Sequence, residues 1–248
     1  MIPISRSDPQ PVPATINQLT GAQPIANEII DAGKNGVDYS QLQEGDILVM
    51  LGNYPSSCCI CCFSLSFGAS HTGVIMKLDN KLWFVESCSF READVAEWIG
   101  ANISTRQPSG VIASDIPETI KYYSACDVYR PDPPLSPEEL RGLRRSFYHY
   151  SGLPYEKSKL QLINVGLGWP ILPTENSLFC SELVSRMFDS INRIEKNTLC
   201  CCIPDWRRWN YDYRPVDIPN IIKCKRLGHM NGTRSIWDIR GWTFGLCG

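Results

Sequence analysis

The sequence has little net charge and no long apolar run. Its 248 residues contain 24 Lys and Arg against 26 Asp and Glu, which gives a formal net charge of −2. Nucleic acids are bound mainly through phosphate contacts with a positive surface, so we expect no nucleic-acid partner. No segment approaches the roughly 20 apolar residues of a membrane-spanning helix.

The first residues also lack the features of a targeting segment. Residues 1–13 have no apolar core of the secretory type, and their prolines disfavour a transit helix. We therefore expect an intracellular, cytoplasmic protein. The hydrophobic share of 43% and the charged share of 20% are typical of a globular chain that can bury a core.

Composition divides the chain into three parts. Residues 1–38 are rich in Pro, Gln, Asn and Thr with little periodicity, which predicts a flexible N-terminal arm. Residues 39–228 contain the strand and helix patterns and are interpreted as one domain, and residues 229–248 as a C-terminal extension. Nothing in the sequence specifies an oligomeric state.

Histidine is scarce, with three residues, whereas cysteine is abundant, with twelve. Adjacent cysteines bridge each other poorly, and a disulfide framework would spread its cysteines along the chain. One alternative for the clustered cysteines is a zinc site, and another is S-acylation with peripheral membrane contact through Cys58, Cys59, Cys61 and Cys62. We favour a plain core segment over both. We expect no metal and no cofactor. Two clusters hold most of these cysteines: Cys58, Cys59, Cys61 and Cys62, then Cys200, Cys201 and Cys202.

The pair Asp79 and Asn80 separates two β-rich runs and indicates a two-residue hairpin loop. Counting outward from that loop places Gly73 opposite Glu86. His71 and Glu86 then share one face of the hairpin at a diagonal distance, within reach of long side chains.

Two helices are signalled clearly. Ser136, Pro137 and Glu139 form a capping box with proline in the first turn, which predicts a helix over residues 137–151. A second helix is expected over residues 176–190 from apolar residues spaced four apart. Elsewhere, residues 91–120 are interpreted as a helix and then a strand, and residues 218–223 as a strand.

Three side chains could perform nucleophilic catalysis together. Cys180 falls in the first turn of the second helix, where unpaired N–H groups and the helix dipole favour a thiolate. His71 opens a strand after small residues and could act as its base. Glu86, in an otherwise apolar strand, could orient the imidazole. The alternatives are a small buried cysteine, a structural histidine and a solvent-facing glutamate.

Six short motifs follow one another along the chain. They are Gly45-Asp46-Ile47-Leu48, Ser70-His71-Thr72-Gly73, Phe84-Val85-Glu86-Ser87, Val128-Tyr129-Arg130, Gly152-Leu153-Pro154-Tyr155-Glu156 and Phe179-Cys180-Ser181-Glu182. Their order resembles the circularly permuted NlpC-type papain-fold hydrolases, most of all the YiiX-like bacterial proteins and their poxvirus relatives. That resemblance implies an α+β fold in which a small antiparallel, partly closed β-sheet packs against helices. It also implies that His71 is the base, Glu86 the orienting acid and Cys180 the nucleophile.

The resulting hypothesis is a thiol hydrolase that cleaves amide, peptide or acyl (thio)ester bonds through a Cys180 thioester. Tyr155 is a candidate substrate contact because of its place in the motif order. The resemblance leaves a peptide or amide substrate and a lipid-acyl substrate both open, and with the latter a lipid acyltransferase. A non-catalytic or membrane-tethered binding protein that keeps the fold is the alternative of a different class.

Overall fold

The computed structural model describes residues 36–53, 68–88, 110–156, 176–194, 198–200, 203–204 and 213–237. The first cysteine cluster, the side chains of the second cluster and the arm up to residue 35 lie outside this part of the chain. The predicted limits of the three segments therefore stay predictions.

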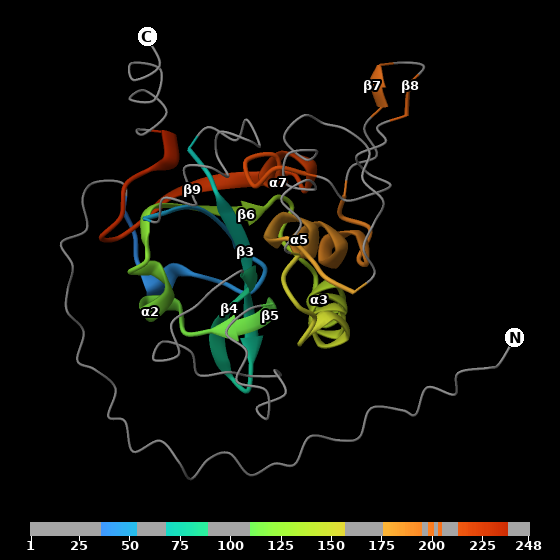
Figure 1. Ribbon diagram of the computed structural model, residues 1–248, viewed down its shortest axis with the longest axis horizontal. Helices are drawn as coiled ribbons and strands as arrows, with labels where there is room; N and C mark the ends of the chain where they lie inside the picture. The colour runs from blue at the N-terminus through green and yellow to red at the C-terminus, as the bar shows by residue number, and fades with distance from the viewer. Residues whose placement is uncertain are drawn as a thin grey trace, which may run out of the picture. The chain divides into compact units, whose positions relative to one another are not determined.

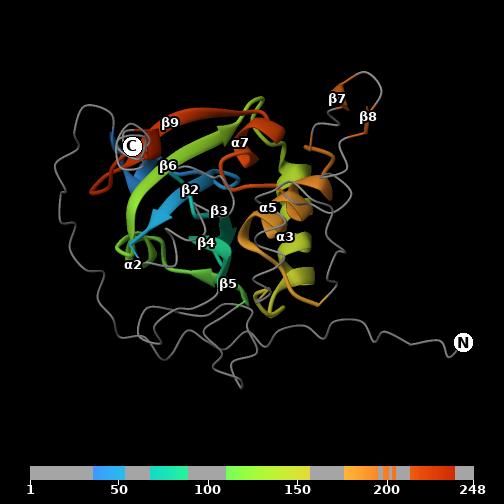
Figure 2. The same ribbon diagram turned by 45° about the horizontal axis from the view of Figure 1, so that its top comes forward.

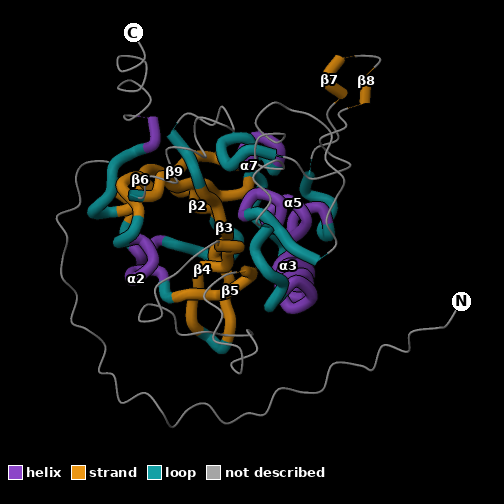
Figure 3. Tube along the Cα trace, viewed as in Figure 1, coloured by secondary structure: helices purple, strands orange, loops and turns teal. Residues whose placement is uncertain are grey.

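Seven strands form one mixed sheet in the order β1-β9-β6-β2-β3-β4-β5 (Figures 1 and 3). All neighbours are antiparallel except β1 and β9, which run parallel, so the sheet departs in one pair from the antiparallel sheet expected. The strands are β1 (Gly36–Val37), β2 (Ile47–Gly52), β3 (His71–Leu78), β4 (Lys81–Cys88), β5 (Gly110–Ser114), β6 (Tyr123–Pro131) and β9 (Cys224–Met230). A separate pair joins β7 (Thr198–Cys200) to β8 (Ile203–Pro204).

Helices lie on both faces of this sheet, which makes the fold α+β as predicted. Helices α3 (Pro137–Tyr150) and α5 (Cys180–Asp189) pack together, and α5 contacts β3 and β4 (Figure 2). Helix α2 (Ile116–Ile120) contacts β4 and β6, on the other side. The remaining elements are η1 (Tyr39–Gln41) and α7 (Ile218–Ile221). Among the described helices, none has both the length and the apolar character needed to cross a membrane.

Alternating side chains of the strands fill two separate cores. Val74 and Val85 belong to the core under α3 and α5, whereas Ile75 and Phe84 belong to the core under α2. Since successive strand residues point to opposite faces, this assigns a face to every neighbouring position. His71 lies four residues before Ile75 on β3, and Glu86 lies two residues after Phe84 on β4. Both therefore lie on the face of the sheet that α2 covers.

The start of α3 follows its sequence signals. Ser136 is the N-cap, and its hydroxyl accepts from the Glu139 N–H at 3.3 Å while the Glu139 carboxylate accepts from the Ser136 N–H at 2.7 Å. Both halves of the predicted capping box are therefore present, and the helix ends at Tyr150, one residue before the expected end.

Two sequence assignments were wrong, and a third is tested only in part. The second helix begins at Cys180 rather than residue 176, because Leu178 is held extended by pairing with Tyr155. Residues 218–223 form α7 and a turn instead of a strand, since Pro219 cannot donate to a sheet ladder. Within residues 91–120, the expected strand is present as β5 and is followed by α2, while the place of the expected helix before it lies outside the described residues.

Phe147 on α3 is expected to be a major stabilising residue. Its side chain is fully buried in the core under the helices, so Phe147→Ala should lower the free energy of unfolding by about 3–5 kcal/mol. The neighbouring Tyr148 is 55% exposed, and Tyr148→Ala should cost less than about 1 kcal/mol. Urea denaturation followed by circular dichroism measures both values, and equal losses in the two variants would contradict this packing.

Candidate active site

The hairpin of β3 and β4 has the register predicted from the sequence. Leu78 pairs with Lys81, and the ladder continues to Val74 opposite Val85. Asp79 has φ 48° and Asn80 φ 64°, the pair of positive values that a type I′ turn requires. The two-residue loop is therefore confirmed, and with it the placement of His71 and Glu86 on one face.

The ladder between β3 and β4 ends at Val74 and Val85, so the predicted placement of Gly73 opposite Glu86 is not a ladder pair, while each strand keeps its neighbour on the other edge. Residues 71–74 of β3 pair with β2, and residues 84–88 of β4 pair with β5. No pairing of β3 with β4 is present past this point in the described residues. His71 of β3 and Glu86 of β4 both lie beyond the last pair of this ladder.

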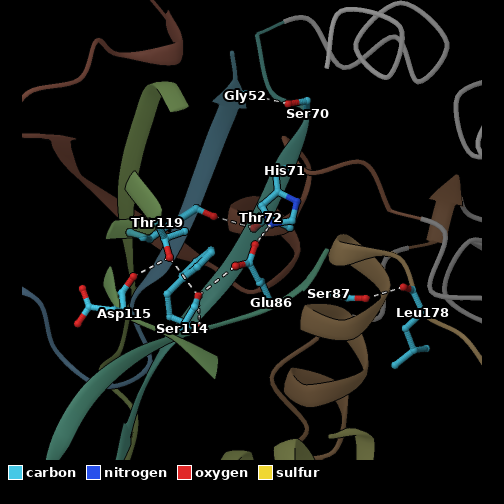
Figure 4. A network of polar contacts seen from close by, with 12 residues as sticks. Gly52, Ser70, His71, Thr72, Glu86, Ser87, Ser114, Asp115, Thr119 and Leu178 are labelled. Carbon is cyan, nitrogen blue, oxygen red and sulfur yellow. Dashed lines mark hydrogen bonds and ion pairs between the residues drawn. The ribbon is translucent and has the colours of Figure 1, made fainter. Parts of the chain in front are cut away.

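The side chains of His71 and Glu86 meet beyond the end of this ladder. The His71 Nε2 and the Glu86 Oε2 are 2.5 Å apart, and Glu86 is fully buried (Figure 4). A buried carboxylate is stable only when hydrogen-bond donors or a positive charge compensate for its lost hydration. His71 supplies such a partner, and in return Glu86 fixes the orientation of the imidazole ring.

The Ser114 hydroxyl contacts the Glu86 oxygen that does not face His71, and the Thr119 hydroxyl contacts Ser114 in turn. The Ser114 hydroxyl lies 3.2 Å from the Glu86 Oε1, within donating distance, and the Thr119 hydroxyl lies 3.1 Å from the Ser114 oxygen. Figure 4 shows the four side chains linked in a row from His71 to Thr119. Because both hydroxyls are buried, water does not compete with them for the carboxylate.

The segment before α5 places Cys180 at the other side of His71. The Ser87 hydroxyl donates to the Leu178 carbonyl at 2.7 Å, which ties this segment to β4. Phe179 is the extended N-cap residue, and its N–H donates to the Glu182 carboxylate at 3.3 Å. Cys180 is thus the first residue of the helix, where the dipole favours an anion most.

The surroundings of Cys180 favour its thiolate. Burial has the largest single effect and opposes the charge, since the side chain is 5% exposed. The positive charge of His71 and a hydrogen bond from its side chain act against burial, as do the backbone N–H groups of Thr72 and Ser181. Their sum lowers the pKa of Cys180 below its ordinary value. Because Nε2 of His71 contacts Glu86, the nitrogen that remains for Cys180 is Nδ1.

The other described cysteines have raised pKa values, in contrast to Cys180. Burial raises the pKa of Cys88 to about 12, and the nearby Cys180 adds to the effect. Burial also raises the pKa of Cys224 to about 12, and the pKa of Cys126 well above its ordinary value. Among the described thiols, Cys180 alone is shifted toward the reactive form.

Tyr155, the predicted substrate contact, lies close to Cys180. Its backbone bridges to Leu178, and its ring meets the Phe179 ring edge-on at 5.7 Å. Burial first, then the charges of Cys180, Cys88 and Glu156, raise the pKa of the Tyr155 phenol. The hydroxyl therefore keeps its proton at neutral pH and can donate a hydrogen bond.

Gly73 allows an aromatic ring to approach the strand. A Cβ at this position would lie 2.5 Å from the Phe84 ring and 2.5 Å from the Val85 carbonyl oxygen. The space beside Gly73 is therefore occupied by the Phe84 ring. The Phe84 ring also meets His71 edge-on at 6.3 Å.

Sequence reasoning did not find Ser114, Thr119 or Tyr123, whose ring lies against His71. A local signal for the first two was present. Asp115, followed by Pro117 and Glu118, is a helix start, and the Asp115 side chain accepts from the Glu118 N–H. Recognising that start would have ended the preceding strand at Ser114. No group of three or more His, Cys, Asp or Glu in the described residues could hold a metal ion.

Comparison with protein-family models and with curated proteins finds no match. Among solved structures, the chain is similar to the crystal structure of metalloprotein yiiX from Escherichia coli O157:H7, described as DUF1105. The TM-score is 0.45 at 17% sequence identity, and the match covers 79% of this chain and 92% of that chain. The chemistry of the candidate site therefore has to follow from this chain's own residues.

Proposed function

We propose that this protein is a cysteine hydrolase in which Cys180 is the nucleophile, His71 the general base and Glu86 the residue that orients His71. One observation carries the proposal. His71 bonds through Nε2 to the buried Glu86 and through its other nitrogen to Cys180, whose pKa is lowered. Nucleophile, base and orienting acid in this sequence of contacts are the parts of a catalytic triad.

The first half of the reaction makes an acyl-enzyme. The Cys180 thiolate attacks the carbonyl carbon of the substrate, a carbon–sulfur bond forms, and the carbonyl electrons move onto the oxygen. The Nδ1 proton of His71 then passes to the leaving nitrogen or oxygen as its bond to the carbonyl carbon breaks. Cys180 is left as a thioester and His71 is neutral.

The second half releases the acid. Neutral His71 takes a proton from water, which attacks the thioester carbon, and the carbon–sulfur bond breaks to return the thiolate and the imidazolium. Both oxyanions need donors, and the Cys180 N–H at the helix start is one. The neutral hydroxyl of Tyr155 is the second donor in this proposal, and it is the role we assign to the predicted substrate contact.

In this proposal the three residues follow the chain order that the resemblance to permuted papain-like hydrolases implies: base, acid, then nucleophile. The base and acid come from β3 and β4, before the nucleophile on α5 in the chain. Amide, peptide and acyl ester substrates all present a carbonyl to this machinery, so the proposed activity is named by its bond type. Transfer of the acyl group to an acceptor other than water would use the same thioester.

The pH dependence of cysteine alkylation tests the proposal. At pH 6.5 iodoacetamide should modify Cys180 at least about tenfold faster than Cys224, because a lowered pKa leaves more thiolate at that pH. The rate for Cys180 should rise at lower pH than the rate for Cys224, whose pKa burial raises to about 12. Peptide mass spectrometry measures each rate separately, and His71→Ala should remove the advantage of Cys180.

The alternative of a binding protein without catalysis makes the opposite prediction. If Cys180 reacts no faster than Cys224, and His71→Ala changes neither rate, the thiol is a small buried residue and the hydrolase proposal is rejected. Cys224 is a suitable internal reference because it is only partly buried and therefore open to the reagent.

A further inference from the structure

A bulge in β6 decides which side chain faces His71. Leu51 of β2 lies opposite Ala125, but the next residue, Gly52, lies opposite Tyr123, so Ser124 has no residue opposite. Without this extra residue, Ser124 would lie opposite Gly52 and share its face. A bulge of this kind moves every residue beyond it to the other face of the sheet.

The bulge therefore turns Tyr123 toward the face of His71. Cys126 and Val128 of β6 belong to the core under α2, and Tyr123 packs against that same core. In a strand without a bulge, the side chain of Ser124 would point to this face and the side chain of Tyr123 to the opposite face.

Tyr123 covers one side of the His71 imidazole. The two ring centroids are 5.6 Å apart with an angle of 18° between the planes, which is a stacked arrangement. Glu86 and Cys180 bind the two nitrogens at the edge of the ring. The edge contacts and the stacked face together leave the imidazole little freedom to rotate.

The backbone around Tyr123 is fixed to the same strand end that holds His71. The Asn53 N–H donates to the Tyr122 carbonyl at 3.1 Å. The Gly52 N–H donates to the Ser70 hydroxyl at 3.1 Å, and the Ser70 N–H donates to the Met50 carbonyl at 2.9 Å. The end of β2 thus holds Tyr123 on one side and the residue before His71 on the other.

We propose that Tyr123 is a positioning residue for the reaction, which acts through His71 and rests on the proposed function. Its ring keeps the imidazole aligned between Glu86 and Cys180, and its negative π face stabilises the imidazolium that pairs with the thiolate. The titratable groups described against His71 are Glu86 from β4, Cys180 from α5 and Tyr123 from β6. From β2, the residue paired with His71 is Met50, which does not titrate.

The test compares Tyr123→Leu with Tyr123→Phe, using iodoacetamide alkylation of Cys180 from pH 5 to pH 9. Tyr123→Leu should lower the rate at pH 6 by about 2- to 10-fold and move the acid limb of the profile to higher pH, because the imidazolium loses its stacking partner. Tyr123→Phe keeps the ring and should restore the rate. Tyr122→Leu is the matched control, because the described ring contacts of His71 are those with Phe84 and Tyr123, and its profile should follow that of the wild type.

Each outcome decides between explanations. If Tyr123→Leu has the wild-type profile while His71→Ala still slows Cys180, the positioning role is rejected and the proposed function stands. If Tyr123→Phe is as slow as Tyr123→Leu, the hydroxyl matters and the stacking role is rejected. If His71→Ala has no effect on Cys180, both proposals fail. Circular dichroism establishes that each variant is folded, and Tyr123→Met replaces the leucine variant if that one does not fold.

Discussion

Replacing Cys180 with serine should lower the turnover of an activated acyl substrate by at least about 10³-fold. The reason is the difference between the two nucleophiles. His71 and the backbone N–H groups of Thr72 and Ser181 stabilise a thiolate at Cys180, but a serine hydroxyl ionises too weakly for the same contacts to make it an anion. Hydrolysis of p-nitrophenyl butyrate and of an N-acyl p-nitroanilide measures the effect for ester and amide bonds.

Two further variants make this result specific. Cys224→Ser should keep the wild-type rate, because Cys224 lies on β9 and makes no described contact with the site. The double variant Cys180→Ser/His71→Ala should be no slower than Cys180→Ser, since a base without its nucleophile contributes nothing. A Cys180→Ser enzyme that retains most of the wild-type rate would remove Cys180 from the mechanism.

The parts of the fold that local chemistry determines could be predicted from the sequence. The start of α3 depends on Ser136 and Glu139, three residues apart, and both capping bonds are present. The pairing of β3 with β4 depends on the two-residue turn at Asp79 and Asn80, and counting from that turn placed His71 and Glu86 on one face.

The helix that carries Cys180 shows where local reasoning fails. Apolar spacing predicted its start at residue 176, but Leu178 is held extended by a bond from the Glu156 N–H to its carbonyl and by a bond from its own N–H to the Pro154 carbonyl. These contacts come from a segment distant in the sequence, so no local pattern reveals them. Their consequence is chemical, because they make Cys180 rather than an earlier residue the first of the helix.

The surroundings of His71 could not be predicted for a similar reason. Tyr123 reaches the ring only because β6 has a bulge opposite Gly52, and the register of distant strands decides where such a bulge falls. Ser114 reaches Glu86 because β5 pairs with β4, and no local pattern in the sequence showed which strand would be its neighbour. The three candidate site residues could thus be named from motif order, whereas the residues packed around them required the sheet topology.

Replacing Glu86 with glutamine should lower turnover by about 10²- to 10⁴-fold, the second large effect expected at this site. Glutamine fits the same space but is neutral, so the imidazolium beside Cys180 loses its counter-charge. The contact with Ser114 adds a second effect. The Ser114 hydroxyl can donate to one side-chain oxygen of Glu86, which favours the amide oxygen of glutamine at that position and directs the amide NH₂ toward the Nε2 of His71.

A donor at that position requires an unprotonated Nε2. The ring proton of neutral His71 must then lie on Nδ1, the nitrogen that faces Cys180, and His71 cannot accept the proton of the thiol. The alkylation rate of Cys180 at pH 6.5 should therefore fall together with turnover. Glu118→Gln is the matched control, because Glu118 pairs with Lys121 on the surface at 2.7 Å, and it should leave both rates unchanged. If Glu86→Gln keeps the wild-type values of both, Glu86 serves the fold alone and the orientation of His71 depends on Cys180 and Tyr123.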